Sequence, residues 1–189
     1  MIVSDKKSVR TALRKKRAEL SEEYISEVSG AFCEAILSLD EFKRCDTVLL
    51  FYPLGNEPDM RRIAFEARSL GKKVAFPISL TESYTLEFHE VSSLDEMKLG
   101  TYGIAEPPTD APPPTITQKT LCVVPALAVD KRGYRIGYGK GYYDRFLASF
   151  AGISLAAVFD GFLLDRLPTE DTDVPLDILI TKTGVIRIR

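Results

Sequence analysis

The side chains best suited to chemistry are concentrated in one glycine-rich segment, Gly133–Phe146 (GYRIGYGKGYYDRF). Its glycines stand at positions 133, 137, 139 and 141, and glycine lets backbone N–H groups approach an anion closely. The segment also carries three cations and one carboxylate: Arg135, Lys140, Arg145 and Asp144. Amide donors and cations suit phosphate oxygens, and a carboxylate suits a magnesium ion. Together these residues predict a site for a polyphosphate such as that of a nucleotide.

Two regular elements are expected to hold this segment in place. The apolar run Leu121–Pro125 before it is typical of a buried strand. After it, Tyr143, Phe146, Leu147 and Phe150 have the i, i+3, i+4, i+7 spacing of an apolar helix face. A loop that leads into the first turn of a helix meets unpaired N–H groups and the positive end of the helix dipole, which favours an anion. The alternative from composition alone is a flexible hairpin whose charges are solvated.

The segment matches neither of two common phosphate-binding motifs. A Walker A loop requires Ser or Thr after its lysine, whereas Gly141 follows Lys140 here. A Rossmann fingerprint requires a third glycine at the position that Tyr142 occupies. The nucleotide prediction therefore depends on the gathering of glycines and cations at a junction between a strand and a helix.

A family resemblance is carried by the same region. The run Val124–Asp130, followed by Arg135–Arg145, resembles the signature of the 5-formyltetrahydrofolate cyclo-ligase (5,10-methenyltetrahydrofolate synthetase) family. The likeness extends over nearly the whole chain and is strongest at residues 124–145. It implies a ligase that uses ATP and Mg²⁺ to close the small-molecule substrate 5-formyltetrahydrofolate to 5,10-methenyltetrahydrofolate, with release of ADP and phosphate. The formyl oxygen would be phosphorylated, and N10 of the folate would then close the ring.

The resemblance also implies which residues contact the nucleotide. The corresponding positions are Lys6, Arg10, Arg135, Ile136, Gly137, Tyr138, Gly139, Lys140, Gly141, Tyr142 and Tyr143. Of the cations in the glycine-rich segment, Arg135, Lys140 and Arg145 are expected to be catalytic. Such cations offset the charge that develops on a transferred phosphoryl group.

Substrate and metal positions follow from the same resemblance. Substrate contacts are expected from four residues: Tyr52, Glu57, Tyr138 and Tyr142. A pterin ring can stack on an aromatic side chain, while Glu57 accepts hydrogen bonds from its ring nitrogens and amino group. Asp144 and Asp177 correspond to magnesium ligands. Phe162 is a departure, because many relatives have glutamine there, so a polar contact near the site is missing or replaced.

Several of these residues also have a plainer interpretation. Lys6, Arg10 and Arg14 are spaced i, i+4, i+8, and such a stripe is usually a solvated helix surface. Without the resemblance, Glu57 would be read as an ordinary loop carboxylate. Asp177 could equally be an aspartate that caps a turn at the start of a strand.

Composition limits the class of protein. The chain has 189 residues, 45% hydrophobic and 28% charged, with a net charge of −2. These values are ordinary for a soluble globular protein and give no support to nucleic-acid binding through bulk charge. No apolar run reaches the length of a membrane span, and the first residues lack the apolar core of a signal peptide. We therefore expect one domain over residues 1–189, monomeric and cytoplasmic, with no membrane or nucleic-acid partner.

The remaining chain predicts an α/β fold. Asp46–Tyr52, Met60–Leu70 and Lys73–Pro77 read as a strand, a helix and a strand, an order that favours parallel pairing. Asp59 is expected to cap the helix and Gly71 to end it. The prediction is a three-layer, Rossmann-like domain with a mostly parallel central sheet and helices on both faces. Ligands of such sheets bind beyond the carboxyl ends of the strands, where we expect the site.

Two helices and several further strands complete the predicted fold. The helices are expected from Ser4 to about Leu20, capped by Ser4 or Asp5, and over Glu22–Leu39, capped by Ser21. The further strands are expected at Leu86–Val91, Ile153–Phe159, Asp173–Thr181 and Val185–Ile188. The proline cluster at 107–114 is stiff and extended, and we interpret it as a crossover within the domain.

The cysteines and the single histidine are expected to be structural. Cys33, Cys45 and Cys122 lack CxxC spacing, so reduced packing residues are favoured. His89 lies in an alternating strand and no GxSxG motif accompanies it, which argues against a Ser–His pair. One histidine also excludes a histidine-rich zinc site.

Two other functions are consistent with these residues. A non-catalytic nucleotide- or folate-binding protein would keep the same fold. An RNA-binding module would stack bases on Tyr138, Tyr142 and Tyr143 between the cations, although the negative net charge disfavours it.

Overall fold

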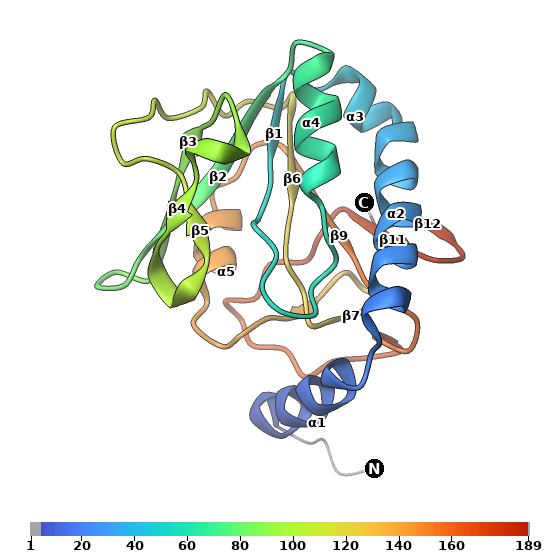
Figure 1. Cartoon of the computed structure of the whole chain (residues 1–189). Helices are drawn as coiled ribbons and strands as arrows, with labels where there is room; N and C mark the ends of the chain where they lie inside the picture. The colour runs from blue at the N-terminus through green and yellow to red at the C-terminus, as the bar shows by residue number, and fades with distance from the viewer. Residues whose placement is uncertain (1–4, 189) are drawn as a thin grey trace.

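A computed structural model describes residues 5–188, which are built around a seven-stranded sheet (Figure 1). Its strands are β1 (Thr47–Leu49), β2 (Lys73–Leu80), β3 (Thr85–Glu90), β6 (Thr120–Val123), β9 (Ile153–Ala157), β11 (Ile178–Thr181) and β12 (Gly184–Arg187). The order across the sheet is β12-β11-β9-β6-β1-β2-β3. The inner strands run parallel, whereas β12 and β3 are antiparallel to their neighbours.

Apolar runs explain the inner strands. Every residue of β1, β6 and β11 is buried, as expected for strands covered on both faces. The register places Val48 of β1 between Val74 and Leu121 on the neighbouring strands. The predicted parallel pairing of β1 and β2 is confirmed, although β1 is shorter than the predicted Asp46–Tyr52 and β2 extends beyond the predicted Lys73–Pro77.

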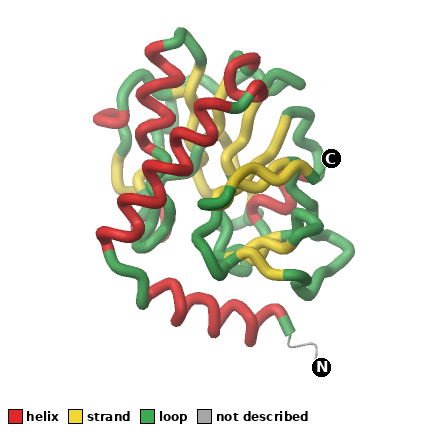
Figure 2. Tube along the Cα trace, turned by 90° about the vertical axis from the view of Figure 1, so that its right-hand side faces the viewer, coloured by secondary structure: helices red, strands yellow, loops and turns green. Residues whose placement is uncertain are grey.

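Helices cover both faces of the sheet (Figures 1 and 2). They are α1 (Lys6–Ala18), α2 (Glu22–Ser38), α3 (Asp40–Arg44), α4 (Arg61–Ser69) and α5 (Tyr142–Leu147). Helices α2, α3 and α4 lie on one face, while α5 packs against β3 on the other, where the rings of Phe146 and Phe88 are 4.8 Å apart. Helix α1 lies beyond the carboxyl ends of the strands, at the bottom of Figure 1. The three-layer α/β prediction is confirmed.

Two small sheets and two short 3-10 turns complete the described chain. One sheet contains β7 (Ala128–Asp130), β8 (Arg135–Ile136) and β10 (Leu163–Leu164), and the other contains β4 (Lys98–Leu99) and β5 (Ala105–Glu106). The turns span Leu94–Glu96 and Thr101–Gly103.

The β7–β8 hairpin corrects our prediction for the glycine-rich segment. We expected a loop running directly from strand to helix, whereas this hairpin intervenes between β6 and α5. Gly133 lies in its turn with a φ of +88°, and a Cβ there would lie 2.7 Å from the carbonyl oxygen of Leu176. Gly133 therefore serves the hairpin, and the loop that leads into α5 is limited to residues 137–141. Helix α5 ends at Leu147, so Phe150 lies outside it.

The two predicted helix caps near the start of the chain are confirmed. Asp5 precedes α1 and Ser21 precedes α2, and their side chains accept hydrogen bonds from the backbone N–H groups of Ser8 and Tyr24. The other candidate cap, Ser4, lies outside the described residues.

Helix α4 begins one residue later than predicted. The cap position is Met60, which makes no side-chain cap bond. Asp59 lies one residue before the cap position, and its carboxylate accepts a hydrogen bond from the backbone N–H of Arg61 at 3.0 Å. Gly71 follows the helix with a φ of +74°, as predicted for the end of a helix.

The proline-rich segment 107–114 runs along the outer edge of β3. The carbonyl of Pro112 accepts from the N–H of Glu90 at 2.8 Å, and His89 Nδ1 lies 2.6 Å from the carbonyl of Ala111. Covering an edge strand protects it from pairing with another chain. His89 is part of this packing, which agrees with the structural role predicted for it.

Cys33, Cys45 and Cys122 are buried, and none forms a disulfide. Burial raises the pKa of the Cys33 thiol to about 11, which makes it a poor nucleophile. The packing role predicted for the cysteines is confirmed. Across residues 5–188, no helix is both long and apolar enough to cross a membrane.

Candidate active site

The loop at 137–141 is shaped by two of its glycines. Gly139 and Gly141 have φ values of +97° and +72°, which L side chains rarely adopt. A Cβ at Gly139 would lie 2.9 Å from Cζ of Arg10, and a Cβ at Gly141 would lie 3.1 Å from Nη1 of Arg145. The glycines therefore let two guanidinium groups pack directly against the loop backbone.

Helix α1 supplies cations to this loop from the other end of the chain. Arg10 Nε donates to the carbonyl of Gly137 at 2.9 Å. Arg14 lies over the ring of Tyr138, with 5.3 Å from Cζ to the ring centre. Lys6 Nζ forms an ion pair with Asp173 at 2.6 Å. Of the stripe on α1, Arg10 and Arg14 thus contact the loop, Arg14 while remaining exposed, whereas Lys6 pairs with Asp173.

Arg135 and Asp144 form a largely buried pair at the base of the loop. Arg135 Nη2 lies 3.0 Å from Asp144 Oδ1, and Nη1 donates to the carbonyl of Val174 at 3.1 Å. The Arg135 side chain is only 3% exposed, against 26% for Asp144. Burial lowers the pKa of Arg135, and the Asp144 charge opposes this shift. The carboxylate therefore remains open to a ligand on its exposed side.

Lys140 and Arg145 meet a group of exposed tyrosines. Arg145 Nη1 donates to the carbonyls of Lys140 at 2.8 Å and Tyr84 at 3.1 Å. Lys140 Nζ lies 5.4 Å from the centre of the Tyr84 ring. Tyr142 packs edge-on to Tyr84, and its hydroxyl lies 3.1 Å from that of Tyr102. These contacts tie the β2–β3 turn to the glycine loop.

Ile136 differs from the other residues of the predicted nucleotide set. Its side chain is 1% exposed and belongs to the core. Its carbonyl accepts from the N–H of Leu127 at 2.8 Å. Its contacts in the structure are those of a packing residue at the start of the loop.

The predicted folate residues reach the glycine loop through Tyr138. Its hydroxyl donates to Glu57 Oε1 at 2.5 Å, while Glu57 Oε2 accepts from the N–H of Leu54 at 2.9 Å. Glu57 is 5% exposed, and burial raises its pKa above the usual range. Tyr52 lies nearby in the chain, with its ring beneath Arg61. The structure therefore places the two predicted subsites in contact.

Within the described chain, the buried side-chain nitrogen and oxygen atoms without a hydrogen-bond partner belong to Arg17, Arg135 and Tyr143. Arg135 Nη2 is close to Asp144 but not aligned for a hydrogen bond. Buried polar groups are almost always paired, so each exception calls for an explanation. Arg17 and Tyr143 interact electrostatically with Glu57, and Arg135 lies at the base of the glycine loop, so all three border the candidate site. Sequence reasoning missed Arg17, which resembles its neighbours in a basic helix.

The structure does not bring the two predicted metal ligands together. Asp177 Oδ2 accepts from the N–H and hydroxyl of Ser154, at 2.8 and 2.7 Å, at the amino ends of β9 and β11. That end of the strands is opposite to Glu57. Among residues 5–188, no group of three or more His, Cys, Asp or Glu side chains is arranged to hold a metal ion. The contacts of Asp177 are those of an aspartate at the start of a strand.

Phe162 is completely buried beneath helix α1. Lys16 Nζ lies 5.0 Å and Arg17 Cζ lies 5.1 Å from its ring centre. At this position, where many relatives have glutamine, the polar contact that we expected to be missing or replaced is replaced by cation–π contacts.

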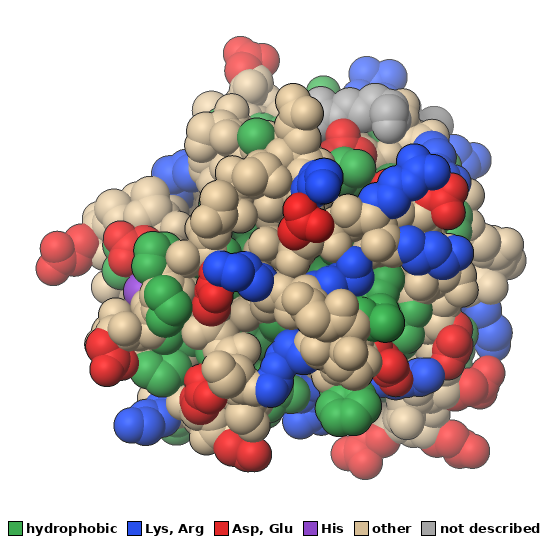
Figure 3. All heavy atoms as spheres, turned by 90° about the horizontal axis from the view of Figure 1, so that it is seen from above, with side chains coloured by type: hydrophobic (Ala, Val, Ile, Leu, Met, Phe, Trp, Pro, Cys, Tyr) green, Lys and Arg blue, Asp and Glu red, His purple; other side chains and the backbone are tan. Residues whose placement is uncertain are grey.

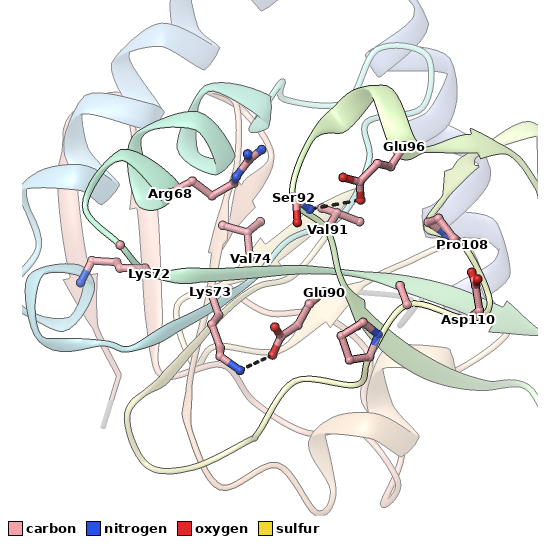
Figure 4. A pocket seen from close by; sticks show the side chains of 13 residues that line it. Arg68, Lys72, Lys73, Val74, Glu90, Val91, Ser92, Glu96, Pro108 and Asp110 are labelled. Atoms are coloured by element: carbon pink, nitrogen blue, oxygen red, sulfur yellow. Dashed lines mark hydrogen bonds and ion pairs between the residues drawn. The ribbon is translucent and has the colours of Figure 1, made fainter.

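A separate hollow of about 620 Å³ lies at the amino ends of the strands, far from the glycine loop (Figure 4). Its charges are partly paired: Lys73 contacts Glu90 at 2.7 Å, and Glu96 accepts from the N–H of Ser92 at 3.2 Å. The face seen in Figure 3 carries cations and carboxylates interspersed. The buried unpaired donors described above lie elsewhere, so we assign this hollow no ligand.

The fold and the candidate site define a class of protein: an α/β domain with a loop rich in glycines and cations beyond the carboxyl ends of its parallel strands. The chain belongs to the 5-formyltetrahydrofolate cyclo-ligase family, whose model matches residues 2–182. The family resemblance found in the sequence is confirmed.

Individual relatives agree with this assignment. The chain is 30% identical to a 5-formyltetrahydrofolate cyclo-ligase of Mycolicibacterium smegmatis, over 100% of this chain and 94% of the relative. A 5,10-methenyltetrahydrofolate synthetase of Aquifex aeolicus has the same fold, with a TM-score of 0.84 and 31% identity over 97% of this chain and 93% of that one. The synthetase of Mycoplasma pneumoniae, at 22% identity and a TM-score of 0.74 over 98% and 100% of the two chains, supports the fold alone.

Proposed function

We propose that this chain catalyses the reaction of its family, the ATP-dependent conversion of 5-formyltetrahydrofolate to 5,10-methenyltetrahydrofolate. One contact within the structure supports this function independently of the family match. Tyr138, within the glycine loop, donates to the buried carboxylate of Glu57, so a nucleotide on the loop and a folate at Glu57 would be neighbours. All the residues involved come from one chain, and a monomer is sufficient.

The chemical problem is the formyl oxygen, which is a poor leaving group. Its attack on the γ-phosphorus of ATP releases ADP and makes the oxygen part of a phosphate ester. N10 of the folate then attacks the formyl carbon and closes the ring, and inorganic phosphate leaves with that oxygen. The protein needs no nucleophile for this sequence. Its task is to position the two substrates and to offset the charge of the transferred group.

The cations at the loop are suited to that task. Lys6 and Arg10 from α1 and Lys140 from the loop would contact phosphate oxygens, in exchange for their present partners. Arg135 would act from a fixed position, because its buried side chain donates to the Val174 carbonyl. Arg145 would exchange its bonds to the carbonyls of Lys140 and Tyr84 for phosphate oxygens. Donors held in place before the reaction stabilise developing charge without reorganising during it.

Asp144 has the chemistry and the exposure expected of a magnesium ligand. Magnesium usually binds through one or two carboxylates together with substrate phosphates, and Asp144 offers a partly exposed carboxylate beside Arg135. The ion would neutralise phosphate charge. We keep Asp177 as a second candidate ligand on the family resemblance alone, since Ser154 holds its carboxylate at the other end of the strands.

Glu57 is suited to recognise the pterin ring. A carboxylate accepts from two neighbouring N–H donors, but here Tyr138 and Leu54 already donate to it. The incoming ring would therefore share or displace the Tyr138 hydroxyl, which ties folate binding to the position of the nucleotide loop.

The test is to mix purified protein with ATP, magnesium and 5-formyltetrahydrofolate and to follow the absorbance of the methenyl product. We expect product only when all three are present, with one ADP released for each methenyl group formed. Binding of both ligands without product would instead support a non-catalytic binding protein.

A further inference from the structure

The turn between β2 and β3 carries a tyrosine in an unfavourable backbone conformation. Residues 81–84 form this turn, just beyond the pairing of Leu80 with Thr85. Tyr84 has a φ of +55°, and Tyr102 is the other non-glycine residue with a positive φ between positions 5 and 188. Bulky side chains rarely adopt this conformation, and residues that do are often found at functional sites, where their surroundings hold them. The contacts that hold Tyr84 are therefore informative.

Two cations beside the glycine loop make those contacts. Arg145 Nη1 donates to the carbonyl of Tyr84 at 3.1 Å and to that of Lys140 at 2.8 Å. Lys140 Nζ lies 5.4 Å, and Arg145 Cζ lies 5.8 Å, from the centre of the Tyr84 ring. Both distances are within the reach of about 6 Å for a cation–π contact. One exposed ring thus contacts both cations.

Lys140 and Arg145 are held without a counter-charge. Exposed lysines elsewhere include Lys131 and Lys73, which pair with Asp165 and Glu90, both at 2.7 Å. Within residues 5–188, neither Lys140 nor Arg145 forms an ion pair, and the nearby like charges repel each other. An aromatic face attracts a cation but carries no net charge. The full charge of both side chains therefore remains available to an anion.

We propose that Tyr84 is a positioning residue that gathers Lys140 and Arg145 at the glycine loop for the triphosphate of ATP. The inference rests on the proposed function, in which both cations contact phosphate oxygens. A carboxylate in place of the ring would repel the phosphate and compete for the cations, whereas the ring does neither. Tyr84 acts through the two cations and does not touch the reacting atoms.

The ring and an incoming phosphate use different parts of each cation. A guanidinium can rest on a ring through its face while its in-plane N–H groups bond a phosphate. The ring occupies none of the three N–H donors of Lys140, so the ammonium group can turn to a phosphate while the stem of the side chain stays beside Tyr84. Long side chains that are already ordered lose less freedom when a ligand binds.

The backbone at Tyr84 allows the ring to be tested apart from the fold. Glycine and asparagine adopt a positive φ more readily than tyrosine does. A residue chosen only for the turn would therefore lack the ring. Replacing Tyr84 by asparagine removes the ring and relaxes the turn, so a loss of ligand binding is not expected to be accompanied by a loss of stability.

The test measures ATP binding by calorimetry, without folate, for Tyr84→Asn and Tyr84→Phe. For Tyr84→Asn we expect binding about tenfold weaker, the factor expected from two exposed cation–π contacts, with Tm within about 2 °C of the parent or above it. Tyr84→Phe keeps the ring face and should bind ATP within about twofold of the parent. An unchanged affinity for Tyr84→Asn, or equal losses in both variants, would overturn the proposal.

Tyr102→Asn is the matched control. Tyr102 has a similar backbone conformation, with a φ of +58°, and its hydroxyl lies 3.1 Å from that of Tyr142. Among the described residues, no cation lies over its ring. This variant should therefore keep the ATP affinity of the parent. A loss as large as that of Tyr84→Asn would mean that the cluster of tyrosines matters rather than the cations, and would contradict the proposal.

A double variant tests whether the ring acts through the cations. In a Lys140→Met background, Tyr84→Asn should reduce ATP affinity by a smaller factor than in the parent, because one of the two cations that the ring holds is then absent. If the two losses simply multiply, the ring and Lys140 act independently and the proposal is wrong.

The proposed reaction can fail separately from this inference. A parent protein that does not bind ATP would reject both the nucleotide site and the role of Tyr84. A parent protein that binds ATP but forms no methenyl product would reject the reaction alone, and the comparison of Tyr84→Asn with Tyr84→Phe would still decide the role of Tyr84.

Discussion

At the scale of single residues, the cations of the site are already bonded to the protein. Arg10 donates to the carbonyl of Gly137, and Arg145 donates to those of Lys140 and Tyr84. Phosphate oxygens are charged and form stronger hydrogen bonds with a guanidinium than a neutral carbonyl does. The internal bonds therefore hold these side chains near the positions that a phosphate requires without preventing the exchange.

Arg135→Lys is expected to reduce kcat by about a hundredfold with the fold retained. Lysine keeps the charge but cannot reproduce the fixed fork that contacts Asp144 and the Val174 carbonyl. Steady-state methenyl formation measures the effect, and Arg187→Lys, altering an exposed pair with Glu41, is the control. Activity of Arg135→Lys within about tenfold of the parent would remove Arg135 from the mechanism.

Glu57→Gln is expected to stabilise the fold near neutral pH while weakening folate binding. Burial raises the pKa of Glu57, so between the unfolded and folded pKa values the folded state binds more protons, and stability falls as the pH rises. Glutamine does not ionise. Its Tm should exceed that of the parent near pH 8 and match it near pH 4, where Glu57 is largely protonated in both states. A lower Tm for the variant near pH 8, measured by circular dichroism, would contradict this.

Asp144→Asn is expected to raise the magnesium concentration needed for half-maximal activity. A neutral amide holds the ion less tightly than a carboxylate does. Magnesium titrations at saturating ATP measure the shift, and Asp177→Asn is the comparison. The Ser154 contacts of Asp177 predict no shift for that variant, whereas the family resemblance predicts one. An unchanged titration for Asp144→Asn would reject Asp144 as a ligand.

Residue types alone are enough to predict an anion site at 137–145, with a flexible hairpin whose charges are solvated as the alternative. They are not enough to single out Arg17 or Asp173. Burial distinguishes Arg17 from the other cations of α1, and burial depends on how the helix packs. Asp173, which pairs with Lys6, lies in an acidic loop whose members look alike in the sequence.

At the scale of elements, α1 serves the site more than the core. Its buried residues are Leu13 and Arg17, whereas Arg10 reaches a carbonyl 127 positions further along the chain. Helix α2, in contrast, buries Val28, Phe32 and other residues against the sheet.

This contrast predicts different effects for two helix caps. Asp5→Ala and Ser21→Ala each remove a side-chain cap worth about 1 kcal/mol. Ser21→Ala should lower Tm by about 2–4 °C and leave the KM for ATP unchanged. Asp5→Ala should raise the KM for ATP, since Lys6 and Arg10 are then less well placed, with a smaller change in Tm. Equal effects of the two variants on both quantities would contradict the division between site and core.

The elements that the sequence did not predict are the shortest ones. Strands β8 and β10 have two residues each, too few for a periodic pattern to appear. The long apolar runs that became β1, β6 and β11 were predictable because burial on both faces demands them. The β7–β8 hairpin was not predicted because its strands are so short, and Gly133 therefore lies in a hairpin turn that the sequence did not indicate.

At the scale of the whole molecule, the sheet separates two edges with different character. The carboxyl ends of the strands collect the glycine loop, Glu57 and the buried unpaired donors. At the amino ends, Lys73 pairs with Glu90 and Lys119 with Asp46. A parallel α/β sheet places its ligand sites at the first of these edges.

The most direct test compares ATP binding by two glycine variants, Gly139→Ala and Gly71→Ala. Both glycines have positive φ, but a Cβ at Gly139 would meet Arg10, whereas a Cβ at Gly71, at the far end of the sheet, would meet nothing within 4 Å. We predict that Gly139→Ala weakens ATP binding by about tenfold or more, a cost of about 1.4 kcal/mol, and that Gly71→Ala lowers only Tm. If Gly139→Ala binds ATP as tightly as Gly71→Ala does, the loop at 137–141 is not the triphosphate site.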